Sequence, residues 1–202
     1  MNLMDKEIII ATKNQHKVLE FRKMLEPLGF SVKSLFDFPH FPDISEDGFS
    51  FEDNARIKAE TATNLLNKMV ISDDSGLEID AFGGQPGIYS ARWLGTLTPY
   101  IYKNKVILDR LQGESNRKAR YVCVLALARP NHETIYFRGE CDLEVAYEAH
   151  GLNGFGYDPI MIDPLSHKTL AELSEDEKNA ISHRGKAVRQ LKAWLEKEYG
   201  KN

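Results

Sequence analysis

The sequence predicts an α/β protein, in which β-strands and amphipathic helices follow one another along the chain. Short apolar runs rich in β-branched residues, such as residues 7–12, are each followed by a segment with apolar residues at helical spacing. Two long runs, residues 119–128 and 135–145, have the apolar or alternating pattern of extended strands. A hydrophobic content of 42% and a charged content of 28% describe an ordinary globular protein.

The first strand is expected over residues 7–12 and leads directly into a helix. Asn14 can cap this helix, and Gly29 can close it. A second strand is expected over residues 31–35. The turn between the first strand and its helix places backbone N–H groups and the positive end of the helix dipole together, which favours an anion such as phosphate. Lys17, in the first helical turn, is unfavourable for that dipole unless an anion is present.

A capping box made by Ser50 and Asp53 predicts a second helix that runs to about Met69. Lys58 falls on the apolar stripe of this helix, among small residues. A lysine in that setting extends its stem along its apolar neighbours until the ammonium reaches a surface. That surface is either plain solvent or a pocket, and the sequence leaves both readings open.

Two adjacent aspartates, Asp73 and Asp74, follow a short β-prone run and precede Ser75 and a glycine. We expect them in a turn between two extended segments, because apolar alternation resumes at residues 77–79. Neighbouring carboxylates repel one another, and a divalent cation is the usual group that offsets the repulsion. A turn whose side chains bond their own backbone explains the same residues, so metal or catalytic use stays open.

The rest of the chain is expected to contain a helix over residues 99–111, the two long β runs as an antiparallel hairpin, and two further helices. Residues 150–163 form a loop in which glycines flank Phe155, a pattern that suits either a bound base or a tight turn. His183 and Arg184 open the last helix and oppose its dipole, as Lys17 does in the first. This repetition suggests that anions or carbonyl oxygens dock at both helix starts.

Composition limits the class of protein. There are 26 Lys and Arg against 30 Asp and Glu, a net charge of −4, which argues against a nucleic-acid surface. No apolar run approaches the roughly 20 residues of a membrane span, and the polar start has no signal-peptide pattern, so we expect a cytoplasmic protein without a membrane partner. Cys123 and Cys141 lack zinc-finger or redox spacing and are expected to be buried free thiols. The absence of a Walker pattern argues against a P-loop NTPase.

Six separated sequence blocks together resemble the inosine triphosphate pyrophosphatase family, from Ile8 to about Leu195. Any one block is weak, whereas six in order are specific. In chain order they are Thr12-x-Asn14-x-x-Lys17, Glu46-x-Gly48-x-x-Phe51 with Asn54-Ala55 and Lys58-Ala59, Ser72-Asp73-Asp74-Ser75-Gly76-Leu77, Gly84-x-Pro86-Gly87-Ile88-Tyr89-Ser90-Ala91-Arg92, Gly154-Phe155-Gly156-Tyr157-Asp158-Pro159, and Ser182-His183-Arg184-Gly185.

The resemblance implies one domain over residues 1–202 with a two-lobed α/β fold. A long twisted mixed β-sheet is flanked by helices in this family, the active site lies in the cleft between the lobes, and the protein is usually a homodimer. The implied activity is magnesium-dependent hydrolysis of deaminated purine nucleoside triphosphates (ITP, dITP and XTP) to the monophosphate and pyrophosphate. Two alternatives stay open: a nucleotide- or metal-binding sensor without turnover, and an enzyme that releases a single phosphate.

The resemblance also assigns roles by position. Asp74 is the implied catalytic residue, and Glu46 and Asp74 are the implied Mg²⁺ ligands, with Asp73 as a further candidate. The implied phosphate contacts are Thr12, Lys13, Asn14, Gln15, His16, Lys17, Lys58 and Ser75. The implied base and ribose contacts are Phe155, Gly156, Tyr157, Asp158, Lys178, His183 and Arg184. The chain departs from the family at residues 98–102, where relatives tend to be more polar and acidic, and at Lys13 and His16, where they often have small residues.

Overall fold

The computed structural model describes residues 6–200, apart from the side chain of His16. The chain divides into two compact units. The first unit comprises Met1–Asp74, Val124–Arg138 and Ala187–Asn202, and the second comprises Ser75–Cys123 and Gly139–Lys186. The expectation of one domain over residues 1–202 stays a prediction.

The described strands form one mixed sheet in the order β2-β1-β3-β4-β5-β6. β1 pairs in parallel with both β2 and β3, whereas β5 and β6 are antiparallel. The strands are β1 (Glu7–Ile10), β2 (Ser31–Ser34), β3 (Met69–Ile79), β4 (Lys118–Ala128), β5 (Ile135–Val145) and β6 (Met161–Ile162). The predicted α/β class with a mixed sheet flanked by helices is therefore confirmed; the expected place of the active site within it stays a prediction.

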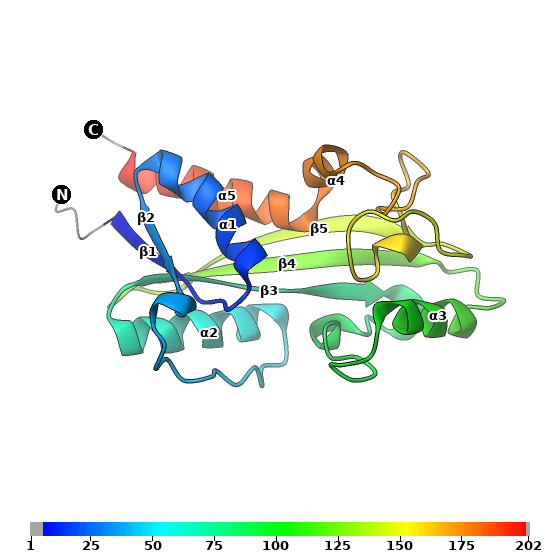
Figure 1. The fold of residues 1–202 in the computed structure, drawn as a ribbon, viewed down its shortest axis with the longest axis horizontal. Helices are drawn as coiled ribbons and strands as arrows, with labels where there is room; N and C mark the ends of the chain where they lie inside the picture. The colour runs from blue at the N-terminus through cyan, green and yellow to red at the C-terminus, as the bar shows by residue number, and fades with distance from the viewer. Residues whose placement is uncertain (1–5, 201–202) are drawn as a thin grey trace. The chain divides into compact units, whose positions relative to one another are not determined.

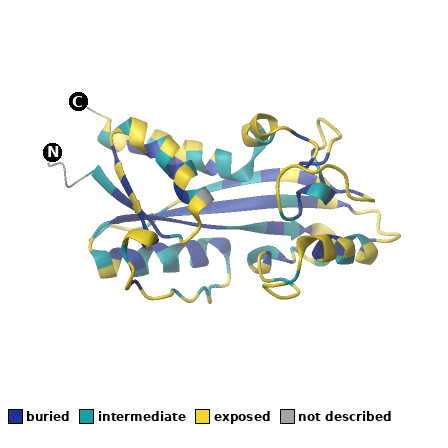
Figure 2. Ribbon diagram, in the orientation of Figure 1, coloured by how far each residue is buried: buried dark blue, intermediate teal, exposed yellow. Residues whose placement is uncertain are grey.

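The first unit packs helices on both sides of its strands. In Figure 1, α1 and the part of α5 that belongs to this unit lie on one side, and α2 lies on the other. The bounds are α1 (Gln15–Leu25), α2 (Phe51–Leu66) and α5 (His183–Tyr199). Apolar side chains from β1, β3 and α2 meet in the core, among them Ile9, Val70 and Ala62. The helices thus bury one face and leave the other to solvent, whereas strands β1, β3 and β4 between them are buried on both faces, as Figure 2 shows.

The predicted helix ends of the first unit are largely confirmed. Gly29, which follows a 3₁₀ turn after α1, has a φ of 85°, a conformation that a glycine adopts without strain. The Ser50 hydroxyl accepts a hydrogen bond from the Asp53 backbone N–H and caps α2. α2 ends before the expected Met69, because Asn67 adopts the left-handed conformation and turns the chain into β3.

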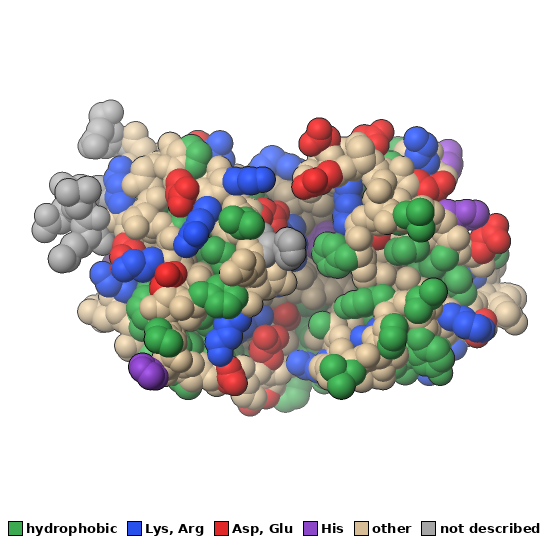
Figure 3. Space-filling view, in the orientation of Figure 1, with side chains coloured by type: hydrophobic (Ala, Val, Ile, Leu, Met, Phe, Trp, Pro, Cys, Tyr) green, Lys and Arg blue, Asp and Glu red, His purple; other side chains and the backbone are tan. Residues whose placement is uncertain are grey.

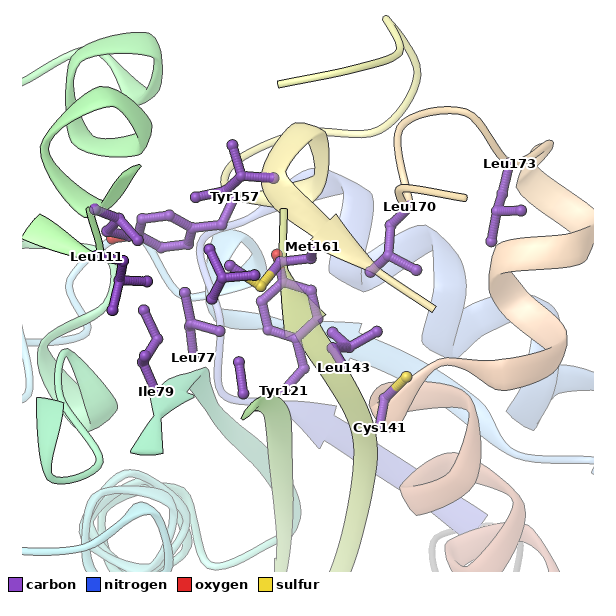
Figure 4. Packing of buried hydrophobic residues seen from close by; sticks show 14 residues of the cluster. Leu77, Ile79, Leu111, Tyr121, Cys141, Leu143, Tyr157, Met161, Leu170 and Leu173 are labelled. Atoms are coloured by element: carbon purple, nitrogen blue, oxygen red, sulfur yellow. The ribbon is translucent and has the colours of Figure 1, made fainter. Parts of the chain in front are cut away.

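The second unit has its own hydrophobic core, shown in Figure 4. The helices of this unit are α3 (Tyr100–Arg110) and α4 (Glu175–Ile181). Leu77 from β3, Tyr121 from β4 and Leu143 from β5 pack with Met161 and the fully buried Ile107 of α3. The strands contribute closely packed apolar side chains to this core, and close packing restricts the movement of the loops that follow the strands.

One sequence prediction about β3 is wrong. We expected Asp73 and Asp74 in a turn, but β3 continues without interruption from Met69 to Ile79. Both carboxylates are buried, at 3% and 8% exposure. Lys17 of α1 compensates Asp73, and Asn54 and Lys58 of α2 compensate Asp74, so the strand does not need a turn that exposes the acids to water.

Other predictions from composition can also be compared with the structure. Cys123 and Cys141 are buried free thiols, as expected. Burial raises the pKa of the Cys141 thiol to about 11, so it is protonated at neutral pH. Across the described residues, no helix has both the length and the apolar character that a membrane crossing requires.

Candidate active site

The turn between β1 and α1 is held by its own side chains, and Asn14 caps the helix as expected. The Thr12 hydroxyl accepts a hydrogen bond from the Asn14 backbone N–H at 3.1 Å, and the Asn14 side chain accepts one from the Lys17 backbone N–H at 3.3 Å. The first turn of α1 contains no acidic residue. The positive end of this helix dipole therefore has no negative side chain in the first turn of the helix to offset it.

A cavity of about 210 Å³ lies in the first unit beside this turn. Its volume is several times the ~30 Å³ share of one water molecule, so it can admit a ligand of several heavy atoms. It is lined by Ala11, Thr12, Lys13, Lys17, Leu35, Pro42, Asp43, Ile44, Glu46, Lys58 and Asp73. Residues from three predicted phosphate or metal blocks, far apart in sequence, therefore meet in one cavity.

Each lysine of this cavity is paired with a carboxylate. Lys13 Nζ lies 2.6 Å from Asp43 Oδ1 on the exposed side. Lys17 Nζ, on α1, lies 2.7 Å from Oδ2 of the buried Asp73. This second pair explains how β3 tolerates a buried acid, because the ammonium replaces part of the hydration that Asp73 loses.

Lys58 has the pocket-facing orientation that the sequence left open. Its side chain is only 13% exposed, and its Nζ lies 3.3 Å from Glu46 Oε1 and 3.6 Å from Asp74 Oδ1. The two carboxylates come from different segments, the loop before α2 and the middle of β3. They converge on one cation, so they can compensate a positive charge jointly.

Asp74 has the properties of a general base that works near neutral pH. The pKa of Asp74 is raised from 3.8 to about 6; burial is the largest cause, and the charges of Glu46 and Asp73 act in the same direction. The Lys58 ammonium and a hydrogen bond from Asn54 lower it. A carboxylate with a pKa just below neutral is ionised at neutral pH and still basic enough to accept a proton from water.

Asn54 is a functional candidate that received no role in the sequence analysis. It is fully buried, its Nδ2 donates to Asp74 Oδ2 at 3.2 Å, and its Oδ1 accepts from the Gly48 backbone N–H at 2.9 Å. A Cβ on Gly48 would lie 2.8 Å from this amide oxygen, so only glycine fits there. Asn54 thus fixes the Asp74 carboxylate and the Glu46 loop together. The available signal was an asparagine on the buried face of a helix, one turn before Lys58.

A second group of predicted site residues lies in the second unit, around Asp158. Oδ2 of this buried carboxylate accepts from Lys178 Nζ at 2.5 Å and from the Phe155 backbone N–H at 2.9 Å. Oδ1 accepts from the Tyr121 hydroxyl at 3.2 Å. A Cβ on Gly154 would lie 2.2 Å from Asp158 Oδ2, which explains a glycine at that position.

This second group presents an aromatic ring and a cation. The Phe155 ring is 73% exposed, and Lys178 Nζ lies 4.8 Å from its centroid. His183, at the start of α5, packs its ring against Tyr121 with the centroids 5.0 Å apart. Arg184 follows His183 and is half-buried. An exposed ring next to a positive charge is suited to a planar, polar ligand.

The remaining predicted site residues lie outside these two groups. Asn14 and Gln15 are exposed, and neither lines the cavity. Ser75 follows Asp74 in β3 and is half-buried. Tyr157 is a core residue: it is 4% exposed, and its hydroxyl donates to the Ser90 carbonyl at 2.7 Å. The side chain of His16 lies outside the described part of the structure.

An α/β sheet with a strand-to-helix turn and lysines at one cavity is typical of proteins that bind phosphate groups. A model of the Ham1 family matches residues 8–194, which is most of the chain. The chain belongs to the Ham1 family. The family resemblance that the six sequence blocks indicated is thereby confirmed.

Individual relatives agree with this assignment. A protein from an Exiguobacterium species, named dITP/XTP pyrophosphatase, is 50% identical over 187 residues, which cover 93% of this chain and 95% of the relative. The Bacillus subtilis protein of the same name is 47% identical over 193 residues, covering 95% and 98%. The structure of the Staphylococcus aureus Ham1 protein superimposes with a TM-score of 0.91 at 43% identity, covering 96% of this chain and all (100%) of that one.

Proposed function

We propose that this protein hydrolyses the triphosphates of deaminated purine nucleosides (ITP, dITP and XTP) to the monophosphate and pyrophosphate. The observation that carries the proposal is the lysine–carboxylate cavity beside Asp74, in a chain about half identical to proteins named dITP/XTP pyrophosphatase. Phosphoryl transfer needs in-line positioning and charge compensation more than covalent catalysis. This cavity offers lysines that can compensate phosphate charge and carboxylates that can hold a cation. No observation favours a sensor without turnover.

The metal that this activity implies is Mg²⁺, and the residues in and beside the cavity fit it. Among the described residues, no three or more His, Cys, Asp or Glu side chains gather as a metal site. Magnesium is commonly held by only one or two carboxylates plus substrate phosphates. Glu46 and Asp74 supply two hard oxygen donors that already converge on the Lys58 ammonium. We therefore assign them as the ligands, with Asp73 as a further candidate. When bound, the metal neutralises phosphate charge.

The ion pairs of the cavity make substrate and metal binding interdependent. A triphosphate alone would have to draw Lys17 and Lys58 away from their carboxylates and leave buried acids uncompensated. A cation alone would meet carboxylates that are already paired. Bound together, phosphates can pair with lysines while the cation pairs with acids. We expect each to strengthen binding of the other.

The chain's own residues supply the proton transfer and the positioning. Ionised Asp74 accepts a proton from the attacking water, and Asn54 holds this carboxylate in one orientation. The turn from Thr12 to Lys17, which includes Lys13, binds phosphate oxygens together with Lys58 and Ser75. The residues of the second unit proposed to surround the base and ribose are Phe155, Gly156, Tyr157, Asp158, Lys178, His183 and Arg184. Tyr157 and Asp158 are buried, so they support the others and do not contact the ligand directly.

We also propose that the protein is a homodimer. Figure 3 shows hydrophobic side chains gathered over α3 and the loop before it, in the second unit. The exposed apolar residues of this segment include Leu97 at 95%, Ile101 at 82% and Tyr102 at 56%. Exposed apolar side chains clustered in this way are typical of protein–protein contacts. A cytoplasmic location stays a prediction.

A substrate panel tests the proposed function. Inosine and xanthosine carry a 6-oxo acceptor where adenosine carries a 6-amino donor, so donors such as those of His183 and Arg184 would be left unpaired by ATP. Such a mismatch can lower kcat/KM by up to about 10⁴-fold. With Mg²⁺, we expect ITP and XTP to be hydrolysed far more efficiently than ATP. Comparable kcat/KM values for ITP and ATP would contradict the proposal.

A further inference from the structure

We infer that Tyr121 is a positioning residue for recognition of the purine, acting through Asp158 on Phe155 and Lys178. This inference rests on the proposed function, because it concerns the residues that we assign to the base. Tyr121 lies on β4, outside all six sequence blocks. It nevertheless contacts two of them: its hydroxyl donates to Asp158, and its ring packs on His183.

The carboxylate of Asp158 is occupied by protein groups. Its two oxygens accept from the Tyr121 hydroxyl, the Lys178 ammonium and the Phe155 backbone N–H. With 3% exposure it presents almost no surface to a ligand. The groups that can meet a base are instead the exposed Phe155 ring and the Lys178 ammonium beside it. Asp158 thus organises the contact surface, and Tyr121 orients Asp158.

The position of Tyr121 gives its hydroxyl a fixed direction. The ring rises from β4 beside Met161 and Leu143 in the core of the second unit, as Figure 4 shows. Burial, followed by the nearby Asp158 charge, holds the pKa of the Tyr121 hydroxyl well above its ordinary value, so the group keeps its proton and acts as a donor. A rotation of the carboxylate would have to break this hydrogen bond.

The test is Tyr121→Phe, which removes the hydroxyl and keeps the ring against His183. In the wild type and the variant, KM for ITP and the inhibition constants of the products IMP and pyrophosphate are measured. Loss of a hydrogen bond to a charged group weakens the interaction that depends on it by about tenfold or more. We expect KM for ITP and the inhibition constant of IMP to rise about tenfold. The inhibition constant of pyrophosphate, which has no base, and kcat should stay within about twofold.

Thr169→Val is the matched control in the same unit. Thr169 is 1% exposed, and its hydroxyl donates to the His150 carbonyl at 2.8 Å and not to Asp158. The two variants each lose one buried hydroxyl, so both should lower the melting temperature by a few degrees. Only Tyr121→Phe should change the constants for ITP and IMP. Equal changes in the two variants would overturn the inference.

A double-mutant cycle shows whether Tyr121 acts through Asp158. Because the hydroxyl works on this carboxylate, adding Tyr121→Phe to an Asp158→Asn variant should change KM for ITP by less than about twofold. Effects that multiply would overturn the inference. If the wild type does not hydrolyse ITP, the proposed function is refuted. If the wild type hydrolyses ITP and Tyr121→Phe has the same KM for ITP and the same inhibition constant of IMP, only this inference is refuted.

Discussion

Replacing Asp74 with asparagine should abolish turnover and at the same time make the metal-free protein more stable at neutral pH. The substitution keeps the size of the side chain and leaves Asn54 a possible hydrogen-bond partner. It removes a negative charge that is buried next to Glu46 and Asp73. Removing that charge should therefore relieve a cost that the active site imposes on folding.

The magnitude follows from the pKa of Asp74. This carboxyl ionises at 3.8 when freely hydrated and at about 6 in the folded protein, mainly because of burial. The folded state therefore binds the proton more tightly, and stability falls as the pH rises from about 4 to about 6 and then levels off. One pKa unit corresponds to about 1.4 kcal/mol, so ionised Asp74 costs about 3 kcal/mol above pH 7.

Urea unfolding of the wild type and Asp74→Asn, with a chelator present, measures this cost. The free energies of unfolding should nearly coincide at pH 4, and the variant should be more stable by about 2–3 kcal/mol at pH 7.5. Asp47→Asn is the control, because Asp47 is exposed and its loss should change stability by less than about 0.5 kcal/mol. An Asp74→Asn variant that is less stable than the wild type at pH 7.5, or a difference independent of pH, would refute the reasoning. Near-normal kcat in this variant would refute the catalytic role.

Four further predictions concern Lys58, the bound metal, Arg184 and the apolar surface of α3. Lys58→Met should lower kcat/KM for ITP tenfold or more and destabilise the protein by about 1–3 kcal/mol at pH 7.5, because Glu46 and Asp74 lose their shared cation. Unchanged kinetics and stability would mean that the lysine only covers apolar surface. Calorimetry with a non-hydrolysable ITP analogue should show at least tenfold tighter binding with Mg²⁺ than with a chelator, and equal affinities would contradict the proposed coupling. Arg184→Ala should reduce the ratio of kcat/KM for ITP to that for ATP, and an unmoved ratio would remove Arg184 from base selection. Ile101→Asp on α3 should shift the protein to monomers in sedimentation, and a monomeric wild type would contradict the dimer.

The sequence predicted helices, strands and their caps well because these depend on local patterns. Apolar spacing and capping residues such as Ser50 act within a few positions of the chain, and the structure confirms them. The wrong prediction was the turn at Asp73 and Asp74. Local sequence patterns predict that adjacent acids lie in a solvent-exposed turn. The charges that allow β3 to keep them buried come from Lys17, which is 56 residues from Asp73 in sequence, and from Lys58.

The site was predictable only in part for the same reason. Motif resemblance supplied the residue types, but the partners that orient them lie elsewhere in the chain. Asn54 is 20 positions from Asp74, and Tyr121 is 37 positions from Asp158. Asn54 stands in one of the six sequence blocks and Tyr121 in none, and neither residue type indicates by itself which carboxylate it orients. Only the packed structure brings each of them to its carboxylate.

The most direct test of the proposed function is the stoichiometry of the products formed from ITP and Mg²⁺, followed by phosphorus NMR. Hydrolysis at the α–β bond predicts one pyrophosphate for each IMP, with no inosine diphosphate and no free phosphate during the reaction. Inosine diphosphate and phosphate as the first products would contradict this account, since they would mean that the protein releases a single phosphate. The absence of any product from ITP, dITP or XTP would contradict the proposed hydrolysis altogether.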